Sequence, residues 1–77
     1  MAPTTEEICG RIAEALGVRA ERVTPDAALT DLVSDSYRLV EMAIELQEDY
    51  DVVFTQADLS AVTTVGDLTR LVLDRLP

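Results

Sequence analysis

Ser36 is the residue of this chain whose setting most suggests chemistry. It stands between Asp35 and Tyr37, at the start of a strongly patterned helical stretch. A serine nucleophile needs a neighbouring base to take its proton, and the chain contains no histidine. We therefore do not expect Ser36 to be a catalytic nucleophile. Two roles stay open for its hydroxyl: it caps the helix, the commoner role of a serine at such a position, or it receives a group that another enzyme attaches.

A phosphate-containing group on Ser36 would meet a favourable backbone environment. The first N–H groups of a helix have no partner within the helix, and the helix dipole places partial positive charge at that end. We expect Asp35 to cap the helix predicted for residues 36–50. An attached phosphate ester is therefore compatible with the local structure.

The helix predicted for residues 36–50 carries apolar side chains on two faces. At about 100° per residue, the core-facing stripe consists of Leu39, Ala43, Leu46 and Tyr50. The opposite side carries an outward row at helical spacing, formed by Tyr37, Glu41, Ile44 and Glu48. Because two large apolar residues alternate with glutamates on this outward face, we interpret the row as a docking surface.

Negative charge is concentrated around the same helix. Residues 31–51 hold seven acidic residues and one arginine, so they contribute −6 of the net charge of −9. Duplex nucleic acid requires clustered Lys and Arg, which excludes it as a partner. We expect partners with basic protein surfaces instead, and their long-range attraction would weaken in salt.

Composition restricts the class of protein further. Seventy-seven residues allow one domain, residues 1–77, without room for a deep catalytic cleft, so we do not expect an enzyme. The single cysteine, Cys9, cannot form an internal disulfide and is expected to be a small apolar filler. With no histidine and one cysteine, no metal site is expected. Residues 1–5 lack a leader pattern and no apolar run is long enough to span a membrane, so we expect a cytoplasmic monomer.

Capping and amphipathic patterns predict an all-α fold, a four-helix bundle with three main helices and one short helix. Capping boxes open three of the helices, in the pairs Thr4 with Glu7, Thr55 with Asp58, and Thr64 with Asp67. They place helices at residues 5–16, at 56–61 and from 65 onward, in addition to the helix at 36–50. The stripe expected to be buried in the first of these is Ile8, Ile12, Ala15 and Leu16, and Gly17 is expected to end it.

The two remaining connections are expected to be ordered. Residues 17–34 exceed the roughly 12–15 residues usual for a structureless loop, with a turn at 24–26 and apolar anchors at Val18, Val23, Leu29 and Leu32. Residues 52–54 are interpreted as an extended linker that buries Phe54, because no second strand signal is present to pair with them.

The segment around Ser36 resembles the attachment site of acyl carrier proteins. The resemblance rests on Asp31-Leu32-Val33-Ser34-Asp35-Ser36-Tyr37, followed by Val40-Glu41 and an acidic helix. Further similarities are Thr24-Pro25-Asp26 in the first loop, Glu48-Asp49-Tyr50-Asp51 at the end of the second helix, and Thr63-Thr64-Val65-Gly66-Asp67 before the last helix. Together they cover nearly the whole chain.

This resemblance implies a carrier with a covalent cofactor. Ser36 would be esterified with 4′-phosphopantetheine, taken from coenzyme A by a phosphopantetheinyl transferase that also recognises Asp35. The thiol of that arm would hold acyl groups as thioesters and present them to acyltransferases, ketosynthases or other pathway enzymes with basic docking patches. The resemblance implies that the positions contacting these partners are Tyr37, Arg38, Glu41, Ile44, Glu45 and Glu48.

Three residues depart from the pattern of that family. The family usually has Leu where this chain has Tyr37, an acidic or small residue where it has Arg38, and Gly where it has Val33. Arg38 is expected to pair with Glu41 one turn on, for about 0.2–0.5 kcal/mol. Tyr37 and Arg38 directly follow the expected attachment point, where partners must dock. We therefore predict a discrete carrier of a specialised, polyketide-like pathway.

Two alternatives stay open. A peptidyl or aminoacyl carrier has the same fold and arm, but typically shows Gly-Gly-His-Ser where this chain has Ser34 and Asp35 before the serine. An unmodified acidic module that binds a basic partner through the second helix is also compatible with the residues. A calcium-binding loop at Asp31 is not expected, because Val33 takes the place of an oxygen ligand.

Overall fold

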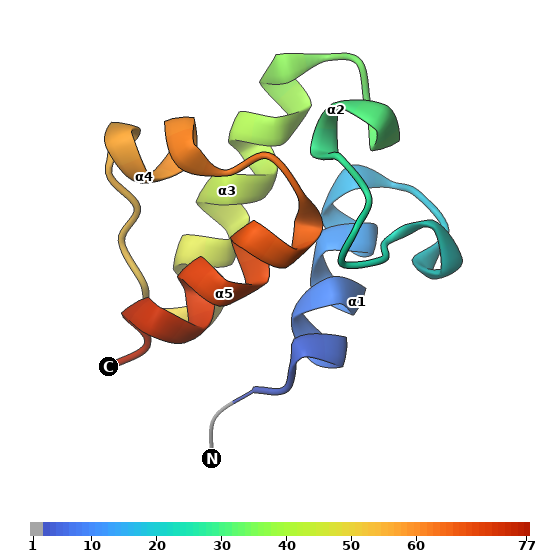
Figure 1. Cartoon of the computed structure of the whole chain (residues 1–77). Helices are drawn as coiled ribbons and strands as arrows, with labels where there is room; N and C mark the ends of the chain where they lie inside the picture. The colour runs from blue at the N-terminus through green and yellow to red at the C-terminus, as the bar shows by residue number, and fades with distance from the viewer. Residues whose placement is uncertain (1–2) are drawn as a thin grey trace.

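The computed structural model describes residues 3–77, and over this range the protein is all-α. Its elements in chain order are α1 (Thr5–Leu16), a 3₁₀ turn η1 (Ala20–Arg22), α2 (Leu29–Leu32), α3 (Ser36–Tyr50), α4 (Gln56–Ala61) and α5 (Val65–Arg75). The predicted all-α bundle is confirmed, with the four-residue α2 as an additional short helix. Figure 1 shows α1, α3 and α5 grouped together, with α2 near the start of α3. The short helix α4 is drawn at the upper left, beside α3 and above α5.

The core lies among the three long helices. α1 packs against both α3 and α5. The side chains with no exposed surface are Ile8, Ile12, Leu46, Val65 and Val72. Because the chain has 4% aromatic residues, this core is built from interlocking aliphatic side chains.

The predicted buried stripes were right in direction but wrong at three positions. In α1 the buried alanine is Ala13, whereas Ala15 is half-buried. In α3 Met42 is buried, while Leu39 and Tyr50 are only half-buried. Leu39 and Tyr50 lie in the first and last turns of α3, where fewer neighbouring side chains cover them than in the middle of the helix.

The helix starts follow the capping pattern with one exception. Thr55 and Thr64 each accept from the third residue of their helix, and Asp58 and Asp67 each return a bond to the cap backbone. At α1 the box is half-formed: the Thr4 hydroxyl accepts from the Glu7 N–H at 3.1 Å, without a return bond from the carboxylate. Both residues are exposed, so water can accept hydrogen bonds from the N–H groups that have no protein partner at this helix start.

The connection between α1 and α3 contains more regular structure than predicted. It holds η1 and α2, which are three and four residues long. Elements this short bury too few residues to leave a periodic signal in the sequence. The expected anchors are confirmed in Val23, Leu29 and Leu32, which are buried.

Residues 25–29 are hydrogen-bonded to the segment that leads into α5. The Leu29 N–H donates to the Thr63 carbonyl at 3.0 Å, and the Val65 N–H donates to the Ala27 carbonyl at 2.9 Å. The Gly66 N–H donates to the Pro25 carbonyl, and a Cβ at Gly66 would stand 3.0 Å from that same oxygen. Any side chain at this position would therefore crowd the Pro25 carbonyl and push the two segments apart.

The linker after α3 is extended, as predicted. Val52 and Phe54 are buried, whereas Val53 between them is 75% exposed. The Gln47 side chain accepts from the Phe54 N–H at 2.8 Å, which fixes the path of the linker back along α3. Among the described residues, no helix has the length and apolar character needed to cross a membrane.

Candidate functional site

Ser36 is the first residue of α3 and is exposed, and its hydroxyl is not needed for capping. Asp35 caps the helix: its Oδ1 accepts from the Tyr37 N–H at 2.9 Å. The Asp35 carbonyl accepts from the Arg38 N–H at 3.1 Å and closes the first turn. Of the two roles that the sequence left open for Ser36, capping is therefore taken by its neighbour. Asp35 was correctly predicted as the cap.

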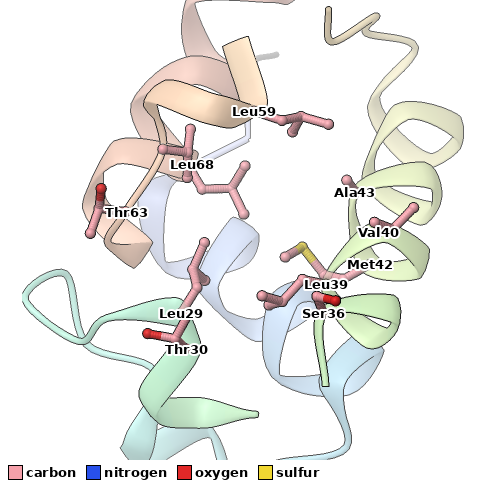
Figure 2. Close-up of a pocket in the computed structure, with 11 residues that line it drawn as sticks. Leu29, Thr30, Ser36, Leu39, Val40, Met42, Ala43, Leu59, Thr63 and Leu68 are labelled. Atoms are coloured by element: carbon pink, nitrogen blue, oxygen red, sulfur yellow. The ribbon is translucent and has the colours of Figure 1, made fainter. Parts of the chain in front are cut away.

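An apolar cavity of about 410 Å³ opens beside Ser36. In Figure 2, Ser36 and Leu39 lie at one end of this cavity, and Leu59 and Leu68 lie across from α3. The full lining is Leu29, Thr30, Ser36, Leu39, Val40, Met42, Ala43, Leu59, Val62, Thr63 and Leu68. Residues from four regions of the chain thus meet next to one hydroxyl group.

Most of this lining was not predicted as part of a site. Leu29 was identified only as an anchor, Thr63 only as part of the resemblance before the last helix, and Leu59 was given no role. Periodicity within one helix cannot show which side chains of other helices face it. The sequence feature that could have indicated the cavity is the number of apolar residues in α3, which is larger than one core-facing stripe needs.

The outward row of α3 is exposed as predicted. Tyr37 is 68% and Ile44 is 46% exposed, and the glutamates beside them, Glu41, Glu45 and Glu48, are also exposed. Val40, 51% exposed, lies between this row and the cavity and was not singled out. One face of α3 therefore presents apolar and acidic side chains together, next to Ser36.

The predicted pair between Arg38 and Glu41 is wrong. Among residues 3–77, no ion pair joins them. The Arg38 Nη2 donates instead to the Leu16 carbonyl at 2.8 Å, across 22 positions of sequence. A carbonyl at the end of a helix carries partial negative charge, so it competes well with an exposed carboxylate for the guanidinium.

Asp49 is the acid of α3 that has an internal partner. The Arg11 Nε donates to Asp49 Oδ2 at 2.8 Å, and its Nη1 also contacts Glu14. The hydrogen bond to Asp49 raises the pKa of Arg11 above its ordinary value. This ion pair ties α3 to α1 and removes Asp49 from the acidic surface that a partner would meet.

The described residues give little support to a reactive thiol or a metal site. Burial raises the pKa of the half-buried Cys9 thiol, which suits the predicted filler role and not a reactive thiolate. Within residues 3–77, no group of three or more Asp, Glu, Cys or His side chains could hold a metal ion. Ser36 and its surroundings are the strongest candidate site.

A family model described as "Phosphopantetheine attachment site" matches residues 6–72. The matched range contains Ser36, the cavity beside it and the outward row of α3. The chain belongs to this phosphopantetheine-attachment family.

Three similar proteins agree with this membership. A "Meromycolate extension acyl carrier protein" of Mycolicibacterium smegmatis is 35% identical in an alignment that covers 94% of this chain and 78% of that protein. The protein of the same description from Mycobacterium leprae is also 35% identical, over 94% of this chain and 67% of its own length. An "Orsellinic acid synthase" of Beauveria bassiana is 40% identical over 65 residues, 83% of this chain but only 3% of that synthase.

A solved structure has the same fold. The solution NMR structure of a holo acyl carrier protein from Geobacter metallireducens matches with a TM-score of 0.82. It is 21% identical in sequence and aligns over 96% of this chain and 86% of its own. The predicted acyl-carrier-like fold is confirmed.

Membership of the phosphopantetheine-attachment family gives the chain its general role. It is an acyl carrier with a covalently attached 4′-phosphopantetheine, and not a catalyst. Its partners in general are a phosphopantetheinyl transferase and synthase-type pathway enzymes. The residues around Ser36 fit such a group: an exposed hydroxyl lies at the N-terminus of a 15-residue helix, and an apolar cavity opens next to it.

Proposed function

We propose that the Ser36 hydroxyl is the attachment point of the 4′-phosphopantetheine arm. The observation that carries this proposal is the division of roles at the start of α3. Asp35 Oδ1 satisfies the Tyr37 N–H, so the exposed Ser36 hydroxyl is available for esterification. The remaining N–H groups of the first turn favour a phosphodiester at this end of the helix.

The attachment step transfers the phosphopantetheine group from coenzyme A to Ser36. Ser36 Oγ forms a bond to the phosphorus that bears the pantetheine of coenzyme A, and the bond from that phosphorus to the adenosine bisphosphate breaks. The Ser36 proton passes to a base of the transferase, since this chain has no histidine to take it. When bound, the arm supplies a terminal thiol that holds acyl groups as thioesters.

The exposed face of α3 is the proposed docking surface. Tyr37 and Ile44 offer apolar contact area, and the exposed acids around them suit a basic patch. The proposed partner-contacting residues are Tyr37, Arg38, Glu41, Ile44, Glu45 and Glu48. Acyltransferases and ketosynthases with basic docking patches are the proposed enzymes.

The cavity beside Ser36 is proposed to shelter the apolar part of the cargo. Ser36 belongs to its lining, and most other lining groups are aliphatic. Burying a methylene group removes it from water and is worth about 0.8 kcal/mol. An acyl chain that folds back from the arm would gain this energy without leaving its own carrier.

We further propose a specialised, polyketide-like pathway and a single-domain monomer located in the cytoplasm. Tyr37 and Arg38, the two residues that follow Ser36, depart from the family pattern and lie where partners dock. The names of the relatives, which refer to meromycolate extension and orsellinic acid synthesis, also point to particular products. If Tyr37→Leu and Arg38→Asp left transfer rates with pathway enzymes and fatty-acid enzymes equally unchanged, the specialised pathway would lose its support.

Intact-mass measurement tests the attachment point. The purified chain and its Ser36→Ala variant are incubated with coenzyme A, magnesium and a broad-specificity phosphopantetheinyl transferase. We expect the wild type to gain the mass of one phosphopantetheine group and the variant to gain none. A gain in both proteins would place the arm elsewhere, and no gain in either would favour the unmodified interaction module.

A further inference from the structure

Arg38 connects the start of α3 to the end of α1. Its Nη2 donates to the carbonyl oxygen of Leu16, the last residue of α1, at 2.8 Å. Its backbone N–H donates to the Asp35 carbonyl, so the same residue also closes the first turn of α3. Arg38 therefore bonds through its backbone within the turn that carries Ser36, and through its side chain to the end of α1.

The end of α1 needs such a partner. The last carbonyl groups of a helix receive no hydrogen bond from an N–H group of the same helix, and they carry partial negative charge. The Gly17 and Val18 N–H groups bond to Ala13 and Glu14, and no basic residue lies in the last turn of α1. Arg38 supplies that cation from another helix.

Gly17 leaves the space that this contact occupies. Gly17 has φ +70°, and a Cβ built there would stand 3.1 Å from the Arg38 Nη2. Any other residue at this position would push against the guanidinium as well as strain the backbone. The helix end and the arginine therefore match each other in shape and charge.

Arg38 lies on the side of α3 away from the Ser36 side chain. Residues two apart on a helix do not face each other. Ser36 lines the apolar cavity, whereas Arg38 lines a separate hollow with Leu16, Gly17 and Asp35. A hydrogen bond on one side of the first turn can thus hold the hydroxyl on the other side in a fixed direction without touching it.

We propose that Arg38 is a positioning residue for the loading of Ser36. By fastening the first turn of α3 to the last turn of α1, it fixes the orientation in which the Ser36 hydroxyl reaches the transferase. This inference rests on the proposed function, in which Ser36 receives the phosphopantetheine arm. This internal role concerns the transferase, whereas the docking contact proposed for Arg38 concerns the acyltransferases and ketosynthases.

Steady-state loading kinetics test this role. Wild type, Arg38→Ala and Arg38→Lys are loaded from coenzyme A by a phosphopantetheinyl transferase, at a temperature where circular dichroism shows each protein folded. We expect Arg38→Ala to lower kcat by roughly two- to tenfold, the range that the loss of one hydrogen bond allows, with KM for the carrier near wild type. Arg38→Lys should recover part of the loss, because an ammonium group can donate to the same carbonyl.

The matched control is Arg19→Ala. Arg19 is exposed, and within residues 3–77 its side chain does not cap η1, so this change removes one positive charge without the contact to α1. Its kcat should equal that of wild type. If Arg38→Ala reduces the folded fraction, Arg38→Met, which keeps a long side chain without a hydrogen-bond donor, is measured in its place, with the same expected fall in kcat.

Each contrary outcome has one meaning. Wild-type kcat in Arg38→Ala, or a loss confined to KM, would overturn the positioning role, the second by showing direct contact with the transferase. A fall of equal size in Arg19→Ala would assign the effect to charge alone and also overturn it. If wild type itself gains no arm, the proposed function fails; if wild type loads and Arg38→Ala loads equally well, only the positioning role fails.

Discussion

Arg75 holds Asp58 by two hydrogen bonds: Nη1 lies 2.8 Å from Oδ2, and Nη2 lies 2.8 Å from Oδ1. Asp58 also completes the capping box that starts α4, with its Oδ2 accepting from the Thr55 N–H. α4 contains no buried residue, yet Leu59 of this helix lines the cavity beside Ser36. Among the described residues, the side-chain hydrogen bonds between this cavity wall and α5 all run through one carboxylate.

Replacing Asp58 by Ala should loosen α4 more than replacing Arg75 by Ala. Asp58→Ala removes the ion pair and one half of the capping box, whereas Arg75→Ala removes the ion pair alone. Amide hydrogen exchange in residues 56–61 should rise in both variants, and more in the first. Asp74→Ala, which changes an exposed acid of α5, is the control and should leave the exchange of α4 unchanged. Equal exchange in Asp58→Ala and wild type would contradict the prediction.

Stability should fall on acidification through the two capping aspartates. Hydrogen bonds from the backbone N–H of Thr55 lower the pKa of Asp58, and those of Thr64 and Thr63 lower the pKa of Asp67, from an ordinary value of 3.8. A group whose folded pKa is lowered contributes stability that is present above its unfolded pKa and lost as pH falls through its folded pKa.

Urea denaturation of Asp67→Asn at two pH values checks this sign. At pH 7 the variant should be less stable than wild type. The difference in the free energy of unfolding should narrow as the pH is lowered below about 4, where the wild-type aspartate also loses its charge. A difference that stays constant with pH would show that the charge of Asp67 contributes nothing.

Gly17→Ala and Gly10→Ala should change stability in opposite directions. The positive φ of Gly17 makes alanine there unfavourable by about 1–2 kcal/mol, and the contact with Arg38 adds to this. Gly10 lies inside α1, and a Cβ there would meet nothing within 4 Å, so alanine should stabilise by about 0.5–1 kcal/mol. Denaturant titration measures both.

The same experiment in an Arg38→Ala background separates the two effects at Gly17. Removing the guanidinium also removes its clash with the new Cβ, but leaves the backbone strain. We therefore expect Gly17→Ala to be less destabilising in that background than in wild type. Strictly additive changes would show that Arg38 and Gly17 do not interact.

Charge reversal on α3 should weaken docking in a salt-dependent way. Glu41→Lys and Glu48→Lys change exposed acids of the proposed docking surface, and each should raise KM for the phosphopantetheinyl transferase. The effect should shrink at high ionic strength, because screening acts on exposed charges. Glu21→Lys in η1 makes the same change of charge away from α3, and an equal rise in its KM would argue against a localised surface.

The elements could be predicted from the sequence because they are determined locally. Thr55 with Asp58 and Thr64 with Asp67 form the predicted boxes, and helix boundaries followed from them. The cavity could not be predicted in this way, because its lining comes from segments far apart in the chain. Arg38 shows the same limit: the sequence suggested the nearest acid as its partner, but the backbone carbonyl of Leu16 has no sequence signature.

The contact between Arg38 and Leu16 has a chemical consequence for a protein that carries thioesters. Thioesters acylate unprotonated amines, so every lysine in a carrier is a potential acceptor of its own cargo. A guanidinium shares its positive charge among three nitrogens and offers no free amine for such an attack. All six basic residues of the chain are arginines. The helix that bears Ser36 is thus held by a cation that does not attack thioesters, and the chain offers no lysine amine to which its own cargo could be lost.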